Sequence, residues 1–420
     1  MGSSVTSGAR ALRAFAGCGV ELEYMLADRK TLSVLPVADE FLRRLGADDP
    51  RTAPQGFAWS EELVPHVLEL KNVSPIADLD PLPRSFQAQV RRANRLLATM
   101  GARLMPTAMH PWMEPRSEMR LWPRDHSAIY AAYDSVFDCR QHGFANIQSM
   151  QVNLPFANDA EFARLHEAIR LVLPILPALA ASSPIVEGDA TGLLDSRMEA
   201  YRTHTLKIPS ITGRVIPDPA ESRAEYEADV LATMYRDIAP QDPDGVLQHE
   251  WLNCRGAIPR FDRNAIEIRV IDMQECPQAD IAIAIAAVGA IRAIYDHPAG
   301  SAPRRQRTGT DALAEIMMAC MQDAERATID DAGYLSVLGF PGRKCEAGEL
   351  WRHLVEVGSR YRTPSSELAL DPLRVVLEQG PLARRILRAV GQDRSRARLS
   401  AVYRELCDCL DEGRMFVGLS

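Results

Sequence analysis

Charged and amide side chains occur at alternate positions of three apolar, strand-like stretches of this 420-residue sequence. The pairs are Glu21 with Glu23, Gln151 with Asn153, and Glu267 with Arg269. Residues two positions apart in a β-strand point to the same face, so each pair shares one face. Carboxylates on a buried face repel one another and lose solvation, unless a cation or another positive group compensates. The pattern therefore predicts an enzyme whose site binds a cation.

Two further acids lie between the first and second of these stretches. Glu69 stands between Leu68 and Leu70, and an isolated acid in an apolar strand needs a partner. Glu62 directly follows Glu61, and that pair is equally compatible with a surface turn. The sequence therefore favours Glu69 over Glu62 as a site residue.

The acidic patterns also have structural explanations. A Glu-Leu-Glu segment such as residues 21–23 is by itself typical of a solvated strand face, but here the strand continues with apolar residues on both faces. Glu267 and Arg269 could form a structural ion pair. In a catalytic site, the same carboxylate would bind a cation and the guanidinium would bind phosphate oxygens.

The amide pair and a basic segment add weaker signals. Gln151 and Asn153 can bind a hard cation through oxygen or a substrate carboxylate through their NH2 groups. Arg197 begins a local basic segment that extends to Arg214 in an otherwise acidic protein. That segment suits an anionic substrate, although a solvated loop explains it as well.

Several common nucleotide and nucleophile motifs are absent from the sequence. There is no Gly-x-x-x-x-Gly-Lys-[Ser/Thr] loop and no Gly-x-Gly-x-x-Gly after a strand. There is also no Gly-x-Ser-x-Gly elbow. If the protein uses ATP, we expect metal-bridged phosphates on a sheet rather than a glycine-rich phosphate loop.

Composition limits the class of protein and its partners. The chain is 46% hydrophobic and 25% charged, with a net charge of −8, and its arginines are scattered, so we expect no nucleic-acid partner. No uninterrupted apolar run approaches the roughly 18 residues of a membrane span. Residues 1–18 lack the apolar core of a signal peptide, so we expect no membrane association and a cytoplasmic location. The eight cysteines show neither zinc nor disulfide spacing.

The periodicity predicts an α+β body followed by a helical region. We expect strands over 19–27, 59–71, 101–108, 147–154, 245–253 and 265–272, and helices over 37–45, 83–100, 127–140, 160–181, 224–237 and 279–295. Residues 311–412 read as wholly helical. The predicted organisation is a flexible arm over 1–18, a catalytic domain over 19–296, a linker over 297–310, and a helical region over 311–420 packed on the catalytic domain.

The shared order of the motifs resembles glutamate–cysteine ligase family 2 and related carboxylate–amine ligases of the glutamine-synthetase-like fold. The likeness extends from about residue 19 to residue 296. It is carried by the Gly-Val-Glu-Leu-Glu strand, the spacing of Glu62 and Glu69, Gln-Val-Asn-Leu at 151–154, Ala-Ser-Ser-Pro at 181–184, Thr191-Gly192, Ser196-Arg197, residues 251–255, Glu-Ile-Arg-Val at 267–270, and Asp272. No single motif is decisive, but their order is specific.

The resemblance implies a largely antiparallel curved sheet flanked by helices, with ATP and Mg2+ as cofactors and an acyl-phosphate intermediate. The implied metal ligands are Glu21, Glu23, Glu62, Glu69, Gln151 and Glu267. The implied catalytic residues are Arg269 and Arg197, and the implied nucleotide-binding residues are Arg269, Arg255, Gln151 and Asn153. Gln151 falls where some relatives carry a metal-binding histidine, and His126-Ser127 replaces an Arg-Tyr pair that many relatives carry.

The expected activity is an ATP-dependent ligation of a carboxylate, most simply the γ-carboxylate of glutamate, to cysteine or another small amine. Small-molecule amino acids and amines would be the partners, and a homo-oligomer is left open. A catalytically silent relative that binds nucleotide or amino acid and regulates a partner is one alternative. A phosphotransferase on the same fold is another.

Overall fold

Neighbouring strands of the central sheet run antiparallel to one another in this computed structural model, which describes residues 11–46, 56–297, 308–361 and 371–419. The seven-stranded sheet has the order β2-β3-β1-β5-β9-β8, with β4 paired to β1. Its strands are β1 (Gly19–Asp28), β2 (Phe57–Glu61), β3 (Val67–Asn72), β4 (Ala102–Met105), β5 (Ser149–Pro155), β8 (Ala257–Arg260) and β9 (Ala265–Asp272). The expected largely antiparallel sheet flanked by helices is confirmed.

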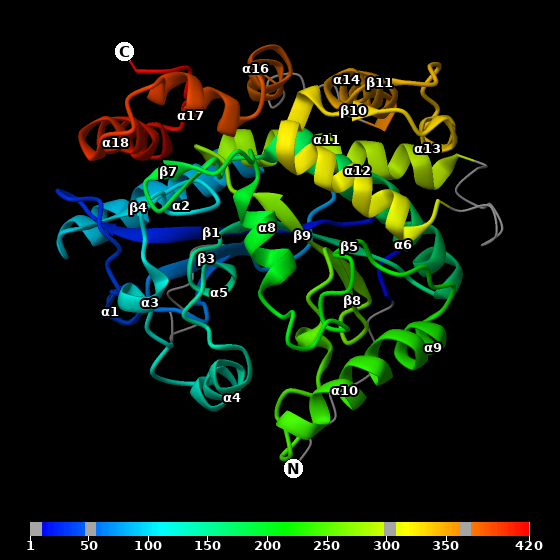
Figure 1. Cartoon of the computed structure of the whole chain (residues 1–420), viewed down its shortest axis with the longest axis horizontal. Helices are drawn as coiled ribbons and strands as arrows, with labels where there is room; N and C mark the ends of the chain where they lie inside the picture. The colour runs from blue at the N-terminus through cyan, green and yellow to red at the C-terminus, as the bar shows by residue number, and fades with distance from the viewer. Residues whose placement is uncertain (1–10, 47–55, 298–307, 362–370, 420) are drawn as a thin grey trace.

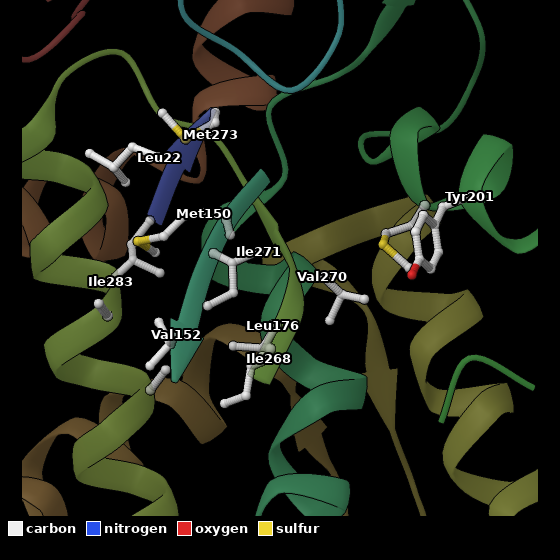
Figure 2. Close-up of a cluster of buried hydrophobic side chains, with 14 of the residues drawn as sticks. Leu22, Met150, Val152, Leu176, Tyr201, Ile268, Val270, Ile271, Met273 and Ile283 are labelled. Carbon is white, nitrogen blue, oxygen red and sulfur yellow. The ribbon is translucent and has the colours of Figure 1, made fainter. Parts of the chain in front are cut away.

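One face of the sheet is apolar and is covered by helix α11 (Pro277–Asp296) (Figure 1). Ile283 of α11 lies beside Leu22 and Met150 of the sheet (Figure 2). The helices that contact α11 include α2 (Leu82–Ala98), α6 (Asp159–Val172), α7 (Leu176–Ala180), α14 (Ala347–Gly358) and α16 (Asp371–Gln379). By length and composition alone α11 could cross a membrane, but 72% of its most apolar stretch is buried inside the protein, as in a core helix.

The opposite face of the sheet is overlaid by shorter helices, most of which are drawn below the sheet in Figure 1. They are α4 (Ser127–Phe137), α5 (His142–Ala145), α8 (Ser196–Thr203), α9 (Arg223–Tyr226) and α10 (Ala232–Ile238). The remaining elements of this part of the chain are α1 (Ala38–Leu45), α3 (Pro115–Glu118), and the hairpin of β6 (Ile185–Val186) and β7 (Asp189–Ala190). The polar residues predicted to form the site lie on this side of the sheet.

The C-terminal region forms a layer beyond α11, at the top of Figure 1. Its helices besides α14 and α16 are α12 (Thr310–Asp323), α13 (Ala332–Val337), α17 (Leu382–Val390) and α18 (Arg396–Glu412). The expectation of a wholly helical region is wrong in one respect, because β10 (Thr328–Ile329) and β11 (Cys345–Glu346) form a short antiparallel pair. These strands are only two residues long, too short for any periodicity to reveal them.

Two predicted strands and one predicted helix differ from the structure. Residues 245–253 form turns and a short 3-10 helix instead of a strand, because the Asp242 carboxylate accepts hydrogen bonds from the backbone of Val246 and Leu247, each at 2.9 Å. The strand that precedes β9 in the chain and pairs with its outer edge is β8. The stretch 59–71 contains two strands, β2 and β3, joined by a turn before His66.

The predicted helix over 160–181 is broken at its prolines, and other helical turns are short. A 3-10 turn separates α6 from α7 where Pro174 removes a backbone donor. Short 3-10 helices lie at Leu173–Ile175, Ala239–Gln241, Glu250–Leu252, Ala324–Arg326 and Ser359–Tyr361, and a π-helical turn lies at Glu227–Leu231.

The described part of the predicted N-terminal arm, residues 11–18, contacts the catalytic body. The Glu161 carboxylate accepts hydrogen bonds from the Arg13 guanidinium at 3.1 Å and from the Ala14 backbone at 2.9 Å. The ring of Phe15 lies edge-on to Tyr295, with centroids 5.2 Å apart. These residues are therefore attached rather than loose. Residues 1–10, and 298–307 of the predicted linker, lie outside the described chain.

A buried ion pair joins the C-terminal layer to the catalytic body. Arg385 of α17 and Glu275, just before α11, form a two-pronged contact, and their side chains are 1% and 0% exposed. Arg385 also donates to the carbonyl of Phe416 at 2.6 Å, and the Phe416 backbone donates to Glu275 at 3.2 Å. The pair therefore fixes three chain segments at one point.

We predict that Arg385→Met lowers the free energy of unfolding by about 3–5 kcal/mol, because it leaves Glu275 as a buried charge without its partner. Urea denaturation measures the change. Arg388→Met, on the exposed side of the same helix, serves as the control and should change stability by less than about 0.5 kcal/mol. Equal effects of the two substitutions would contradict this role for the pair.

Candidate active site

The strand register places the predicted polar residues side by side on one face of the sheet. The cross-strand neighbours are Glu23 with Glu69, Glu21 with Lys71, Glu21 with Gln151, and Asn153 with Glu267. Like charges directly opposite one another destabilise a sheet. The Glu23–Glu69 pair therefore needs compensation from groups around it.

A cavity of about 670 Å³ lies over this face and falls within the size range of small-molecule sites. All five predicted acidic ligands line it, together with Lys71, Gln151, Arg197, Arg260, Arg263 and Arg269. The structure thus brings together the acids from β1 and β3, the acid and arginine from β9, and the arginine of α8. Residues far apart in sequence form one charged wall.

Fixed donors stabilise two of the acids. The Glu23 carboxylate accepts hydrogen bonds from the Ser149 backbone at 2.6 Å and from the Gln151 amide at 2.7 Å. Burial nevertheless raises the pKa of Glu23. The Glu267 carboxylate lies 3.1 Å from Arg260 of β8 and 3.1 Å from Arg269 of its own strand. Glu267 therefore already has two guanidinium partners.

Glu21 and Glu69 instead share a proton and a lysine. Burial and the charge of Glu69 raise the pKa of Glu21 to about 9, and the two carboxyl groups are hydrogen-bonded. Burial opposes ionisation of Glu69, but the hydrogen bond from Glu21 and the Lys71 ammonium lower its pKa overall. Lys71 forms a close ion pair with Glu69 and lies 3.9 Å from Glu21. The ammonium and the proton together neutralise this pair.

Glu62 joins the cluster from the turn between β2 and β3. Burial, followed by the charges of Glu23 and Glu69, raises its pKa well above the usual range. Although the sequence favoured Glu69 over Glu62, the structure places Glu62 on the wall of the same cavity. A bound cation would favour the ionised form of a carboxyl group whose pKa is raised in this way.

A register shift in β9 determines which of its residues face the cavity side. Between the β5 positions Met150 and Val152, β9 has one additional residue. In a regular strand, Glu267 and Asp272 would point to opposite faces, because they are five positions apart. The extra residue allows both to reach the side on which Arg197 lies, and such bulges commonly redirect side chains beside active sites.

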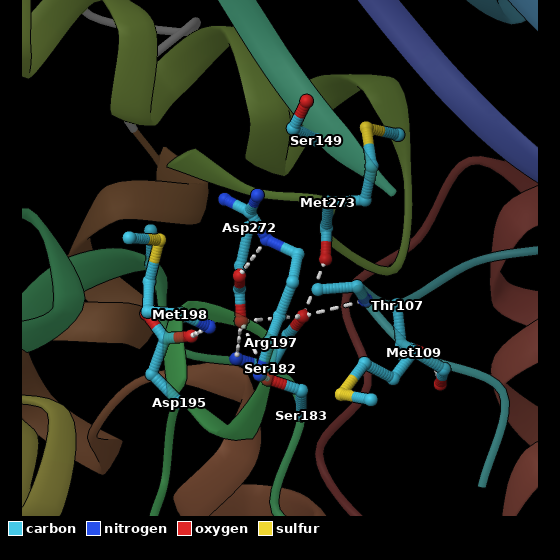
Figure 3. Close-up of polar contacts among 12 residues, drawn as sticks. Thr107, Met109, Ser149, Ser182, Ser183, Asp195, Arg197, Met198, Asp272 and Met273 are labelled. Carbon is cyan, nitrogen blue, oxygen red and sulfur yellow. Dashed lines mark hydrogen bonds and ion pairs between the residues drawn. The ribbon is translucent and has the colours of Figure 1, made fainter. Parts of the chain in front are cut away.

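Asp272 anchors Arg197 in a buried network (Figure 3). Its carboxylate accepts from the Arg197 Nε at 2.6 Å, the Ser182 backbone at 2.8 Å and the Ser183 hydroxyl at 3.0 Å. The α8 helix begins at this network, with the Asp195 side chain accepting from the Met198 backbone at 2.9 Å. The Asp272 carboxylate therefore fixes the position of the Arg197 side chain, which is the predicted catalytic arginine.

Two buried donors on the cavity wall remain available to a ligand. The Arg197 Nη2 has no hydrogen-bond partner among the described residues, and its side chain is 1% exposed. The Tyr201 hydroxyl makes no conventional hydrogen bond in the described chain, although the weakly polar Cys254 thiol is next to it. Arg269 is close enough to Tyr201 for each to shift the other's pKa. These donors are suited to bind an anionic group.

Two predicted nucleotide-binding residues lie outside the wall. Arg255 is directed away from the cavity, and its guanidinium binds Asp218 at 2.9 Å and the Ser210 carbonyl at 3.1 Å. Asn153 does not line the cavity either, but its amide donates to Glu21 at 2.9 Å. Asn153 thus supports an acid of the site, whereas Arg255 stabilises the loop before β8.

Sequence reasoning missed Lys71, Tyr201 and Arg260. Lys71 was detectable, because it lies two positions after Glu69 in the same strand and so shares its face. Tyr201 lies four residues after Arg197, and this spacing puts both side chains on one face of a helix. Arg260 was not detectable once the strand before β9 had been placed over 245–253.

His126, noted as a departure from the family, has a left-handed backbone and lies 3.5 Å from Glu61 at the cavity rim.

The donor set suits a hard divalent cation, although its geometry is not assembled for one. Carboxylate and amide oxygens are the ligands that Mg2+ prefers. Among the residues that the structure describes, no three acidic, histidine or cysteine side chains already converge in metal-ligand geometry. Lys71 lies between Glu21 and Glu69, so the acids now face an ammonium. The residues fit a cation chemically, provided that Lys71 moves aside.

Comparisons with known proteins identify relatives of this chain. The family model described as glutamate–cysteine ligase family 2 matches residues 18–405. An uncharacterized protein of Archaeoglobus fulgidus is 31% identical over 405 residues, which cover 95% of this chain and 100% of that protein. A protein of Bradyrhizobium diazoefficiens with the provisional name glutamate–cysteine ligase 2 is 26% identical over 286 residues, which cover 67% of this chain and 60% of that protein.

A solved structure shares the fold. The crystal structure of a glutamate–cysteine ligase from Francisella tularensis, in complex with AMP, superposes with a TM-score of 0.61 and 13% identity, covering 96% of this chain and 90% of that one. At this identity the likeness shows the fold alone. The family model, in contrast, spans nearly the whole chain, including every residue of the acidic wall, and the protein therefore belongs to glutamate–cysteine ligase family 2.

Proposed function

We propose that this protein is an ATP- and Mg2+-dependent ligase that joins the γ-carboxylate of glutamate to a small amine through an acyl phosphate. The observation that carries the proposal is the meeting, in one cavity, of five glutamates with Arg197, Arg269 and the Tyr201 hydroxyl. Acids of this kind would hold cations, and the donors would hold transferring phosphoryl groups. Family membership supports a ligase.

The chemistry explains why such a site needs no protein nucleophile. A carboxylate is a poor acyl donor, because oxide is a poor leaving group. Its oxygen attacks the γ-phosphorus of ATP, the bond to the β-phosphate oxygen breaks, and ADP departs. The amine nitrogen then attacks the acyl carbon, the carbon–oxygen bond to phosphate breaks, and the ammonium formed loses a proton to solvent. Phosphate and an amide remain.

The residues of the chain would divide these tasks between them. Glu21, Glu23, Glu62, Glu69 and Glu267, with the Gln151 amide oxygen, would hold the cations. Bound Mg2+ would neutralise the β- and γ-phosphates and align them for attack. Arg269 and Arg197 would stabilise charge on the transferring phosphoryl group, and the rigid anchoring of Arg197 by Asp272 would reduce the cost of reorganisation.

We predict that the purified protein releases ADP and phosphate from Mg-ATP only when glutamate and a suitable amine are both present. The test keeps glutamate fixed, varies the amine in a panel that includes cysteine, and identifies products by mass. The expected product has the summed mass of acid and amine less one water. A phosphorylated acceptor without an amide would indicate a phosphotransferase instead. Nucleotide binding without turnover would indicate a silent regulator.

We predict that Glu21→Gln abolishes most turnover but stabilises the protein. The raised pKa keeps Glu21 protonated in the folded state at neutral pH, so its contribution to stability is lost as pH rises from about 4.5 through about 9. A glutamine resembles the protonated acid and can still donate to Glu69. The gain in unfolding free energy should be about 1–3 kcal/mol at pH 8 and close to zero at pH 4.

Glu267→Gln is the matched comparison for this substitution. It should also abolish turnover, but it removes the carboxylate paired with Arg269 and leaves Arg260 only the more distant Asp262, so it should lower stability rather than raise it. Denaturation of both variants at the two pH values measures the contrast. Wild-type turnover in either variant would remove that residue from the proposed ligand set.

We predict that Lys71→Met strengthens cation binding to the nucleotide-free protein. Lys71 now neutralises Glu21 and Glu69, so a divalent cation must displace its ammonium. Removing that competitor should lower the Kd for Mn2+ by about tenfold. Calorimetric titration measures the Kd, with Lys344→Met, at an exposed site outside the cavity, as the control. An unchanged or higher Kd would show that Lys71 does not occupy the cation position.

A further inference from the structure

A series of aromatic rings also lines the cavity and forms its aromatic wall. Ring centroids of Trp251 and Tyr133 are 5.5 Å apart, those of Tyr133 and Phe144 are 6.1 Å apart, and those of Phe144 and His204 are 4.6 Å apart. Tyr201 continues the series 4.9 Å from His204. The rings therefore form one continuous surface that ends at the Tyr201 hydroxyl, beside Arg269.

Apolar side chains of this wall are only partly buried where they line the cavity. Phe144 and Trp251 are in this state, as are Ile129 and Ile147 at its edges. Partly exposed aromatic rings that gather in a concavity typically mark a binding surface for an apolar group. Their helices α4 and α5 lie across from the sheet in Figure 1.

The aromatic wall carries no charge to bind a zwitterion. In the described chain, none of the cavity-lining residues within α4, α5 or the Glu250–Leu252 turn is ionised at neutral pH. Burial lowers the pKa of His204 to about 4, so its ring is neutral as well. Burial likewise raises the pKa of Tyr133 well above its usual value. Along the rings, an amino acid such as cysteine would find no charged partner for its carboxylate, and only the end of the wall at Tyr201, beside Arg269, offers donors to an anion.

The position of this wall assigns it to the amine. The proposed phosphates and the carboxylate that accepts the phosphoryl group are held on the sheet side, by the acids with Arg197 and Arg269. The nucleophile must reach the acyl carbon from the remaining side, which is the aromatic wall. A primary amine could place its nitrogen near Tyr201 and extend its body over Phe144 and Trp251.

We propose that the amine substrate is a primary amine with an aromatic or bulky apolar body, in place of cysteine. This inference rests on the proposed ligase function and adds a substrate class to it. Ring–ring contacts along Trp251, Tyr133 and Phe144 would bind the amine and orient its nitrogen. Glutamate would keep its charged contacts on the sheet side of the cavity.

The test compares phenethylamine with cysteine and ethylamine as amines for the full chain, with Mg-ATP and glutamate held constant. We expect kcat/KM for phenethylamine to exceed that for cysteine by at least about tenfold. Ethylamine, which has the reacting group without the ring, should be the poorest substrate. Amide formation with cysteine but not with phenethylamine would overturn the inference and leave the proposed ligase function intact.

Two variants locate the binding surface. Trp251→Leu and Phe144→Leu should each raise KM for phenethylamine by about tenfold while KM for ATP stays within about twofold. Tyr235→Leu, an aromatic of α10 outside the cavity, is the control. A rise in KM for ATP instead would assign the rings to the adenine and overturn the inference.

Calorimetry separates failure of the inference from failure of the proposed function. If no amine supports ADP release, the ligase function is overturned, and phenethylamine is titrated into the protein directly. Binding that Trp251→Leu weakens about tenfold, but Tyr235→Leu does not, would support the aromatic site by itself. Absence of such binding would overturn the site as well.

Discussion

The cost of burying carboxylates on one face of a sheet is the constraint on which this structure depends. The protein meets it in three ways: Glu23 receives hydrogen bonds from the backbone and an amide, Glu267 receives two arginines, and Glu21 with Glu69 receives a lysine and a proton. The first two solutions are permanent. In the proposed function the third would be exchanged, because a divalent cation would replace both the proton and the ammonium. Glu21 and Glu69 would then couple cation binding to the charge of the site.

The opposite face of the same strands explains how the sheet remains stable despite its buried carboxylates. Leu22 and Met150 pack on α11, whose surface is apolar almost all round, and this burial supplies the stability that the acidic face lacks. The C-terminal layer then covers α11 and is joined to its beginning by Arg385 and Glu275. The additional helices thus act on the site indirectly, by holding the apolar side of the sheet in place.

Alternation of residue types was sufficient to predict β1, β5 and β9 and the shared face of their polar residues, because period-two patterning is a local property. It could not predict β8, which contains Pro259 and is only four residues long, and it therefore missed Arg260. Whether Arg255 or Arg197 reaches the cavity depends on distant groups, Asp218 and Asp272. These partners are brought close only by the tertiary structure. The residue type and the order of the motifs therefore could not show that Arg197 reaches the cavity and Arg255 does not.

The two walls of the cavity impose opposite requirements on any molecule between them. The sheet side favours a ligand that brings cations and phosphates, whereas the aromatic side disfavours an anionic group, since a negative charge over the rings would lose solvation without gaining a partner. The proposed reaction, in which a charged acyl phosphate is converted to a neutral amide group, would therefore take place on the boundary between the walls. Arg269 and Tyr201 lie on that boundary, and an amine nitrogen held there in its neutral form could attack while the departing phosphate remained on the charged side.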